Sequence, residues 1–175
     1  MPAAVAIAER ILRQVVREVE SITSIDHVGR MTAHGRWWDG SAWIENRENS
    51  DAMVVFQGEQ EIEQALGDNT APCYLRMSVA IVVITGQAET STTPVDSLIR
   101  NWNALVRQAL MTNPFLTETV APTQRLAIDS RIVSIPDVVA GESPREFDAF
   151  TFMDIDYVHR RNNPFVGPGI TQLEE

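Results

Sequence analysis

The N-terminal part of the chain alternates apolar and charged side chains with the period of an α-helix. Its apolar residues stand three or four positions apart, at Ile7, Ile11, Val15, Val19 and Ile22. Arginines and glutamates fill the positions between them, which places the apolar side chains on one helical face. Residues 4–22 are therefore predicted to form an amphipathic helix that packs against another part of the protein.

A second helix is predicted between Thr93 and Asn113. Thr93 suits the N-cap, and Pro94 suits the first helical position because its fixed φ matches a helix. Apolar side chains again share one side, at Leu98, Trp102, Leu105, Ala109 and Leu110. The helix should end near Asn113, because Pro114 disfavours helical geometry in the residue before it.

Five other segments have the composition or alternation of β-strands. They are residues 27–31, 51–57, 73–86, 125–135 and 145–159. The longest apolar pattern is CYLRMSVAIVVITG, which begins at Cys73, and one of its faces should belong to the core. Between the second and third of these strands, residues 58–68 are polar, and we expect a short helical turn or an acidic loop there.

The order of helix, strands, helix and two further strands predicts an α+β fold. Hairpin-like connections favour a two-layer arrangement, in which two long helices cover a mostly antiparallel or mixed β-sheet. The length suits a single domain, predicted over residues 1–161. Residues 162–175 contain two prolines, two glycines and an acidic end. They are expected to form an extended C-terminal arm.

The charge of the chain limits its partners. Its formal net charge is −10, and all 14 basic residues are arginine. The lack of lysine excludes chemistries that need an amine, such as Schiff-base formation and the phosphate-binding loop of nucleoside triphosphatases. The acidic balance argues against tight duplex binding, which depends on cations that neutralise phosphates. No apolar run approaches the ~20 residues of a membrane-spanning helix, so no membrane partner is expected.

Asp154 and Asp156 are the clearest candidates for chemistry. They lie two positions apart on the last predicted strand and so point to the same side, as a paired-carboxylate or magnesium site requires. The same arrangement arises on the solvated or subunit-facing side of an edge strand, where charges prevent uncontrolled pairing. We favour this second interpretation. The three histidines are not spaced as metal ligands, and no cofactor or metal is expected.

Three tryptophans flank a turn signal at Asp39-Gly40. Trp37, Trp38 and Trp43 could stack a sugar or a base, but the segment lacks the basic groove that usually accompanies such binding. Tryptophan is enriched at interface hot spots. Burial under a loop or at a protein interface is therefore the preferred interpretation. Cys73, the single cysteine, is predicted to be a small buried side chain in a strand.

Several segments together resemble the tail-terminator, or tail-completion, proteins of long-tailed bacteriophages. They are the N-terminal amphipathic helix, DAMVVFQGE with its acidic bend, CYLRMSVAIVVITG, VDSLIRNWNALVRQALMTNPF and FTFMDIDYVHRRNNPF. The most specific part is the end of the last strand, Tyr157-Val158-His159-Arg160, followed by a polar pair and Pro164-Phe165. The WWDGSAW segment is not part of this similarity, and Asn162-Asn163 stands where a glycine-aspartate pair is expected.

The resemblance implies a structural virion protein without enzymatic activity. Such a protein would form a ring, expected to be hexameric, that caps the head-proximal end of the tail tube, stops its growth and joins the tail to the neck. Its partners would be other copies, the tube protein and a neck or head-completion protein, while DNA passes through the lumen without specific binding. It would assemble in the host cytoplasm and reside in the virion. The alternative from the same particle is a head-closure or neck adaptor protein of the head-tail connector.

A ring needs two unlike patches on each subunit, one meeting the other on the next copy. The acidic segment, residues 39–68, and the arginine-rich strand end, residues 159–161, supply two such patches. The expected contacts with a neighbouring subunit or the tube are His159, Arg160, Arg161, Pro164, Phe165, Trp37, Trp38 and Trp43. The acidic residues expected to line the lumen or to face a neighbour are Glu59, Glu61, Glu63, Asp154 and Asp156. An alternative of a different class, a ligand-binding or catalytic domain, would use Asp154, Asp156 and His159.

Overall fold

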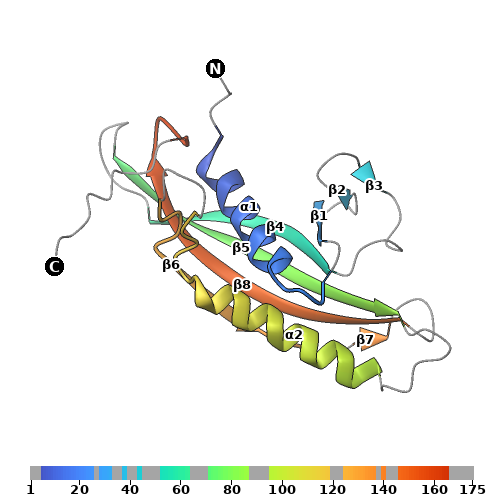
Figure 1. Ribbon diagram of the computed structural model, residues 1–175. Helices are drawn as coiled ribbons and strands as arrows, with labels where there is room; N and C mark the ends of the chain where they lie inside the picture. The colour runs from blue at the N-terminus through green and yellow to red at the C-terminus, as the bar shows by residue number, and fades with distance from the viewer. Residues whose placement is uncertain are drawn as a thin grey trace.

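The computed structural model describes ten segments of the 175-residue chain. They are residues 5–25, 28–32, 37–38, 43–44, 52–63, 71–86, 95–118, 124–136, 139–140 and 146–165. The elements in chain order are α1 (Ile7–Glu20), β1 (Val28–Thr32), β2 (Trp37–Trp38), β3 (Trp43–Ile44), β4 (Ala52–Glu63), β5 (Pro72–Gly86), α2 (Val95–Thr112), β6 (Asp129–Ser134), β7 (Val139–Ala140) and β8 (Glu146–Arg160). Figure 1 shows the long strands β5 and β8 side by side, with the two helices in front of them.

The strands of the described segments form one mixed sheet in the order β3-β2-β1-β4-β5-β8-β6, with β7 also paired to β8. Five strands are longer than two residues. β1 and β4 run parallel, whereas every other neighbouring pair is antiparallel. The predicted α+β class, with a mostly antiparallel mixed sheet and two helices, is confirmed.

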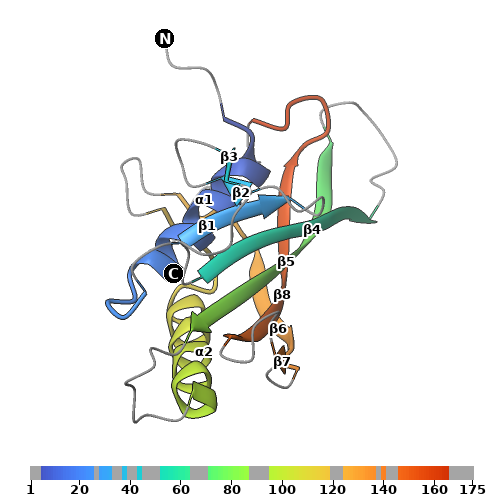
Figure 2. The ribbon, with the colours of Figure 1, turned by 90° about the vertical axis from the view of Figure 1, so that its right-hand side faces the viewer.

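Both helices contribute to one core, on the same side of the sheet (Figure 2). The apolar stripe of α1 is buried as predicted, at Ile7, Ile11, Val15, Val19 and the following Ile22. From α2 the fully buried side chains are Ile99, Val106 and Leu110. They join the side chains of alternate residues on β5 and β8: Leu75, Met77, Val79, Ile81, Val83, Ala149, Met153, Ile155 and Tyr157. Neither helix in the described segments has the length and hydropathy needed to cross a membrane.

The end of α2 is fixed by Asn113 and Leu116. Leu116 adopts the left-handed conformation, with φ of 46°, and its side chain is fully buried. Its backbone N–H donates to the Asn113 carbonyl at 2.9 Å. The Asn113 side chain donates to Glu18 of α1 at 2.7 Å and accepts from the Thr117 N–H at 2.9 Å. The helix thus ends where Pro114 predicted, and the turn after it is tied to α1. The predicted caps Thr93 and Pro94 lie outside the described residues.

Three sequence-based expectations are wrong. Leu105 was expected on the apolar side of α2 but is 39% exposed, because Ile99, Asn103, Val106 and Leu110 form the buried side of this helix. Residues 58–63 were expected in a turn or loop but continue β4, because β5 offers partners as far as Tyr74 across two register shifts. The polar side chains Glu59, Gln60 and Glu61 are exposed on this strand, so no apolar alternation marks it in the sequence. β8 was expected to be an edge strand, but it lies between β5 and β6. Its charged residues therefore do not protect a sheet edge.

Candidate functional site

The chain turns back sharply after β8. The N–H of Asn163 donates to the Arg160 carbonyl at 2.9 Å, and His159 Nδ1 donates to the same oxygen at 2.7 Å. Two further backbone bonds fix this turn, from Arg161 N to Ala71 O at 3.0 Å and from Ile7 N to Pro164 O at 3.1 Å. Residues 162–165, predicted to begin an extended arm, thus lie against the start of α1. The rest of that segment, 166–175, is outside the described residues.

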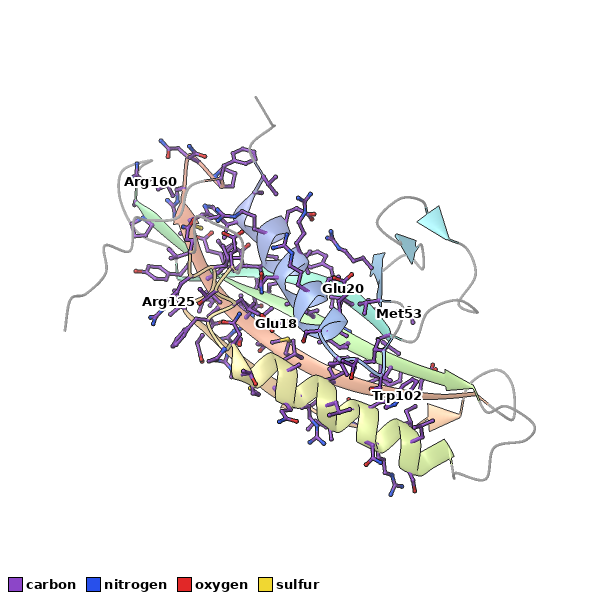
Figure 3. The ribbon with its side chains drawn as sticks, viewed as in Figure 1. Glu18, Glu20, Met53, Trp102, Arg125 and Arg160 are labelled. Carbon is purple, nitrogen blue, oxygen red and sulfur yellow. The ribbon has the colours of Figure 1, made fainter. Side chains whose placement is uncertain are left out.

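The two arginines at this turn differ in their surroundings. Arg161 donates to Glu61 of β4 at 3.2 Å, so the basic strand end and the acidic segment, expected to meet between subunits, are paired within one chain here. Arg160 is exposed and has no ion-pair partner among the residues that the structure describes. Figure 3 shows Arg160 at the end of the molecule where β8 stops. Phe165, five residues later in the chain, is 45% exposed, and Pro164 is also exposed.

Beneath the turn lie two protonated groups. The Tyr157 side chain is buried, and this burial raises the pKa of its phenol well above the usual range, helped by a hydrogen bond to Glu59. Burial also raises the pKa of the Cys73 thiol, and the nearby Glu61 carboxylate acts in the same direction. A thiol held protonated is a poor nucleophile. The prediction of Cys73 as a buried side chain is confirmed.

Asp154 and Asp156 point to the same face of the sheet, as predicted from their spacing, and this face lies opposite the core that the helices share with Met153, Ile155 and Tyr157. Arg76 donates to both oxygens of Asp156, at 2.7 and 3.0 Å, and Arg131 adds a contact at 3.3 Å. The hydrogen bonds from Arg76 lower the pKa of the Asp156 carboxyl. Asp154 accepts from the Ser78 hydroxyl at 2.9 Å. The pair is therefore part of a network that arginines largely neutralise, rather than a free acidic surface.

The remaining predicted residues are only partly defined. Glu59 is exposed at the edge of β4, and Glu63 is the last residue of that strand, its side chain being outside the described set. Trp37 and Trp38 form β2 and Trp43 begins β3, with Trp38 paired to Trp43 across an antiparallel hairpin. The side chains of the three tryptophans are likewise outside the described set. Within the part of the chain that the structure describes, no three histidine, cysteine or acidic side chains gather as metal ligands do.

An exposed apolar strip along β6 was not predicted from the sequence. Ile128, Val133 and Ile135 are all exposed, although Val133 belongs to a strand. The pairing of β6 with β8 shifts register between Ile132 and Ser134, which takes Val133 out of the regular alternation. The run Ile132-Val133 followed by Ile135 was the available signal, because it places apolar residues on both faces of a strand.

Comparison with known proteins adds no assignment to this geometry. No protein-family model matches the chain, and no curated protein matches it significantly.

Proposed function

We propose that the chain is the subunit of a ring, built from identical copies, that caps the head-proximal end of a bacteriophage tail tube. The ring would stop the tube from growing and would join the tail to the neck. The resemblance of the long segments and of the β8 end to tail-terminator proteins supports this proposal. In this role the protein catalyses no reaction and needs no cofactor or membrane. It would assemble in the host cytoplasm and reside in the virion.

One observation carries the proposal: a single fixed turn presents both an exposed cation and an exposed aromatic ring. The Arg160 side chain is exposed without a partner in the described residues, and Phe165 lies five residues further on. Backbone bonds to Ala71 and Ile7 hold this turn against two other elements. Arginine and aromatic side chains are enriched at interface hot spots, and a preorganised surface loses little entropy on binding.

In the proposed ring, Arg160 donates to carboxylates or carbonyls of the next copy and Phe165 fills an apolar site there. Such a contact joins two different patches, which is the condition for a ring. The net charge of −10 fits a lumen through which DNA passes without binding, because phosphate contacts need cations.

The proposal also assigns a role to each layer of the fold. We take the two long helices to cover one face of the sheet, which is supported by the core that joins α1 and α2 to alternate residues of β5 and β8. The sheet edges and the turn after β8 are then left for contacts with copies and with the tube.

Tail length in particles that lack this protein tests the proposal. Loss of a terminator leaves tubes of irregular length, or tails that do not join heads. Loss of a head-closure or neck adaptor protein, the alternative function, leaves tails of normal length beside capsids that leak DNA. Electron microscopy of lysates from a deletion mutant distinguishes these outcomes, and normal particles would contradict both.

A further inference from the structure

An exposed arginine stacks on an exposed phenylalanine between the end of α2 and the start of β6. The guanidinium carbon of Arg125 lies 4.4 Å from the centroid of the Phe115 ring. Phe115 is 36% exposed, and Arg125 is exposed without an ion-pair partner in the described residues. A guanidinium held over a ring keeps the N–H groups along its edge for hydrogen bonds to another group. The stacked pair, Phe115 and Arg125, can therefore receive a carboxylate.

The backbone fixes the stacked pair in place. The N–H groups of Leu126 and Ala127 donate to the Phe115 carbonyl, at 3.3 and 3.0 Å, and Arg125 forms an antiparallel bridge with Thr117. A preorganised surface of this kind loses little entropy when it binds. These two backbone donors are already used, so a partner at this point has to be bound by side chains.

The acidic side chains nearest to the stacked pair in the sequence have other partners. Glu118 accepts a hydrogen bond of 2.9 Å from Nε of Arg10 in α1. Asp129, on the face of the sheet opposite the helices, lies 3.8 Å from Arg131. The cation of the stacked pair is thus left for a carboxylate from another molecule, and Ile128, 41% exposed, offers an apolar contact nearby.

The second half of β4 carries complementary side chains. Glu59, Glu61 and Ile62 are exposed there, Ile62 by 46%. β1 pairs with β4 only over residues 52–56, so no described strand lies on the outer side of this half. Glu61 forms an exposed ion pair of 3.2 Å with Arg161, and a carboxylate can accept further hydrogen bonds. Two such acidic surfaces would repel each other, whereas one of them and a stacked pair attract.

The two surfaces lie at the same level on opposite flanks of the sheet. Strand pairing connects them through the row Glu59-Met77-Ile155-Ser130. The Ser130 hydroxyl donates at 2.7 Å to the carbonyl of Pro114, which directly precedes the stacked pair. Met77 and Ile155 belong to the core that the helices share, so this row points to the helical side of the sheet. Figure 3 shows Arg125 at the margin of the molecule.

A neighbour in the same orientation would bring its Glu59 and Glu61 towards the stacked pair without a shift along the strands. A contact that repeats without such a shift can close into a ring, whereas a shift that repeats at every contact gives a helix. The contact joins side chains and leaves the strand pairing within each copy unchanged.

We propose that the stacked pair of one copy binds Glu59 and Glu61 of the next copy, with Arg125 donating to their carboxylates. The partner of the stacked pair is therefore a second copy of the same chain. The inference rests on the proposed function, because it identifies a contact between subunits of the proposed ring, in addition to that of Arg160.

Reversing the charges one at a time tests the contact. Arg125→Glu and Glu61→Arg each place like charges opposite each other at every interface, so each variant alone should lose the ring that native mass spectrometry detects for the wild type. An equal mixture of the two variants should form the ring again, because alternating copies place opposite charges together at every interface of an even-numbered ring. The masses should show equal numbers of both variants. Each variant should melt within a few degrees of the wild type, since both side chains are exposed.

Arg100→Glu, which changes an exposed arginine on α2, is the matched control and should assemble as the wild type does. Rings of normal mass from Arg125→Glu alone would overturn the inference. So would a mixture that stays unassembled, or wild-type protein that stays monomeric when concentrated. In these cases the length of tails in a deletion mutant still decides the proposed function. A restored mixed ring, together with normal tails in the deletion mutant, would support the contact and contradict the proposed function.

Discussion

The carboxylate of Asp156 accepts two hydrogen bonds from Arg76, and this pairing links the stability of the sheet to pH. The pKa of Asp156 is lowered in the folded protein, chiefly by Arg76. A carboxyl with a depressed folded-state pKa stabilises the fold fully above its unfolded value of about 3.9 and loses this contribution as the pH falls through the folded value. The network thus holds β5, β8 and β6 together at neutral pH and weakens in acid.

We expect Asp156→Asn to lower the free energy of unfolding by about 1–2 kcal/mol at pH 7, the range for a partly exposed charged hydrogen bond. The difference from wild type should shrink as the pH drops below about 4, because Asp156 then becomes protonated in the wild type too. Urea denaturation at neutral and acidic pH measures both. Asp154→Asn is the control, with a smaller loss, since its arginine contacts are 3.8–3.9 Å. A difference that does not change with pH would contradict this account.

Thr151 and Asn103 form a buried polar contact between β8 and α2. The Thr151 hydroxyl donates to Asn103 Oδ1 at 2.5 Å, and both side chains are buried. Thr151→Val should cost about 1–3 kcal/mol, because the amide oxygen is left without this donor. Thr112→Val removes an exposed hydroxyl that donates to the Gln108 carbonyl, and should change stability by less than about 0.5 kcal/mol. Equal losses of stability for the two variants in thermal or urea unfolding would contradict this explanation.

At the level of the elements, apolar periodicity predicted both helices and the long strands β5 and β8. Pro114 also predicted where α2 ends. The second half of β4 could not be predicted, because Glu59, Gln60 and Glu61 are exposed there and the strand exists only through its pairing with β5. The interior position of β8 could not be predicted either, because the alternation of polar and apolar residues within one strand does not show which strands lie beside it.

Leu116, in the turn that follows α2, has a backbone φ that is usual for glycine. Leu116→Ala should cost about 2–5 kcal/mol through the lost burial. Glycine normally destabilises a site relative to alanine, but here it relieves a left-handed strain of about 1–2 kcal/mol. We therefore expect Leu116→Gly to be at least as stable as Leu116→Ala in urea unfolding. A glycine variant clearly less stable than the alanine variant would show that the backbone conformation carries no strain.

For the whole molecule, the sequence identified the charged strand end and the acidic segment but not how they combine. Arg161 and Glu61 are 100 positions apart, and their pairing depends on β4 continuing beside β5 to a point near the end of β8. Asp154 and Asp156 were correctly placed on one face, whereas Arg76, 80 positions before Asp156, was not foreseen as their partner. The exposed apolar strip along β6 could be recognised only from the pairing of β6 with β8.

Arg160 and Arg161, at the end of β8, have different surroundings, and this difference leads to a prediction about assembly. Arg160→Glu should prevent oligomers from forming while leaving the melting temperature within a few degrees of wild type, because the side chain is exposed. Arg100→Glu, an exposed arginine on α2, is the matched control and should assemble normally. Light scattering coupled to size-exclusion chromatography gives the mass, and calorimetry gives the melting temperature. Normal oligomers of the Arg160→Glu variant would contradict a role for Arg160 in the interface between copies.

The most direct measurement of the central claim is the position of this chain in assembled particles, determined by electron cryomicroscopy. The account predicts a closed ring of identical copies between the last ring of the tail tube and the neck. Density for the chain elsewhere in the particle, or particles that do not contain it, would contradict the account.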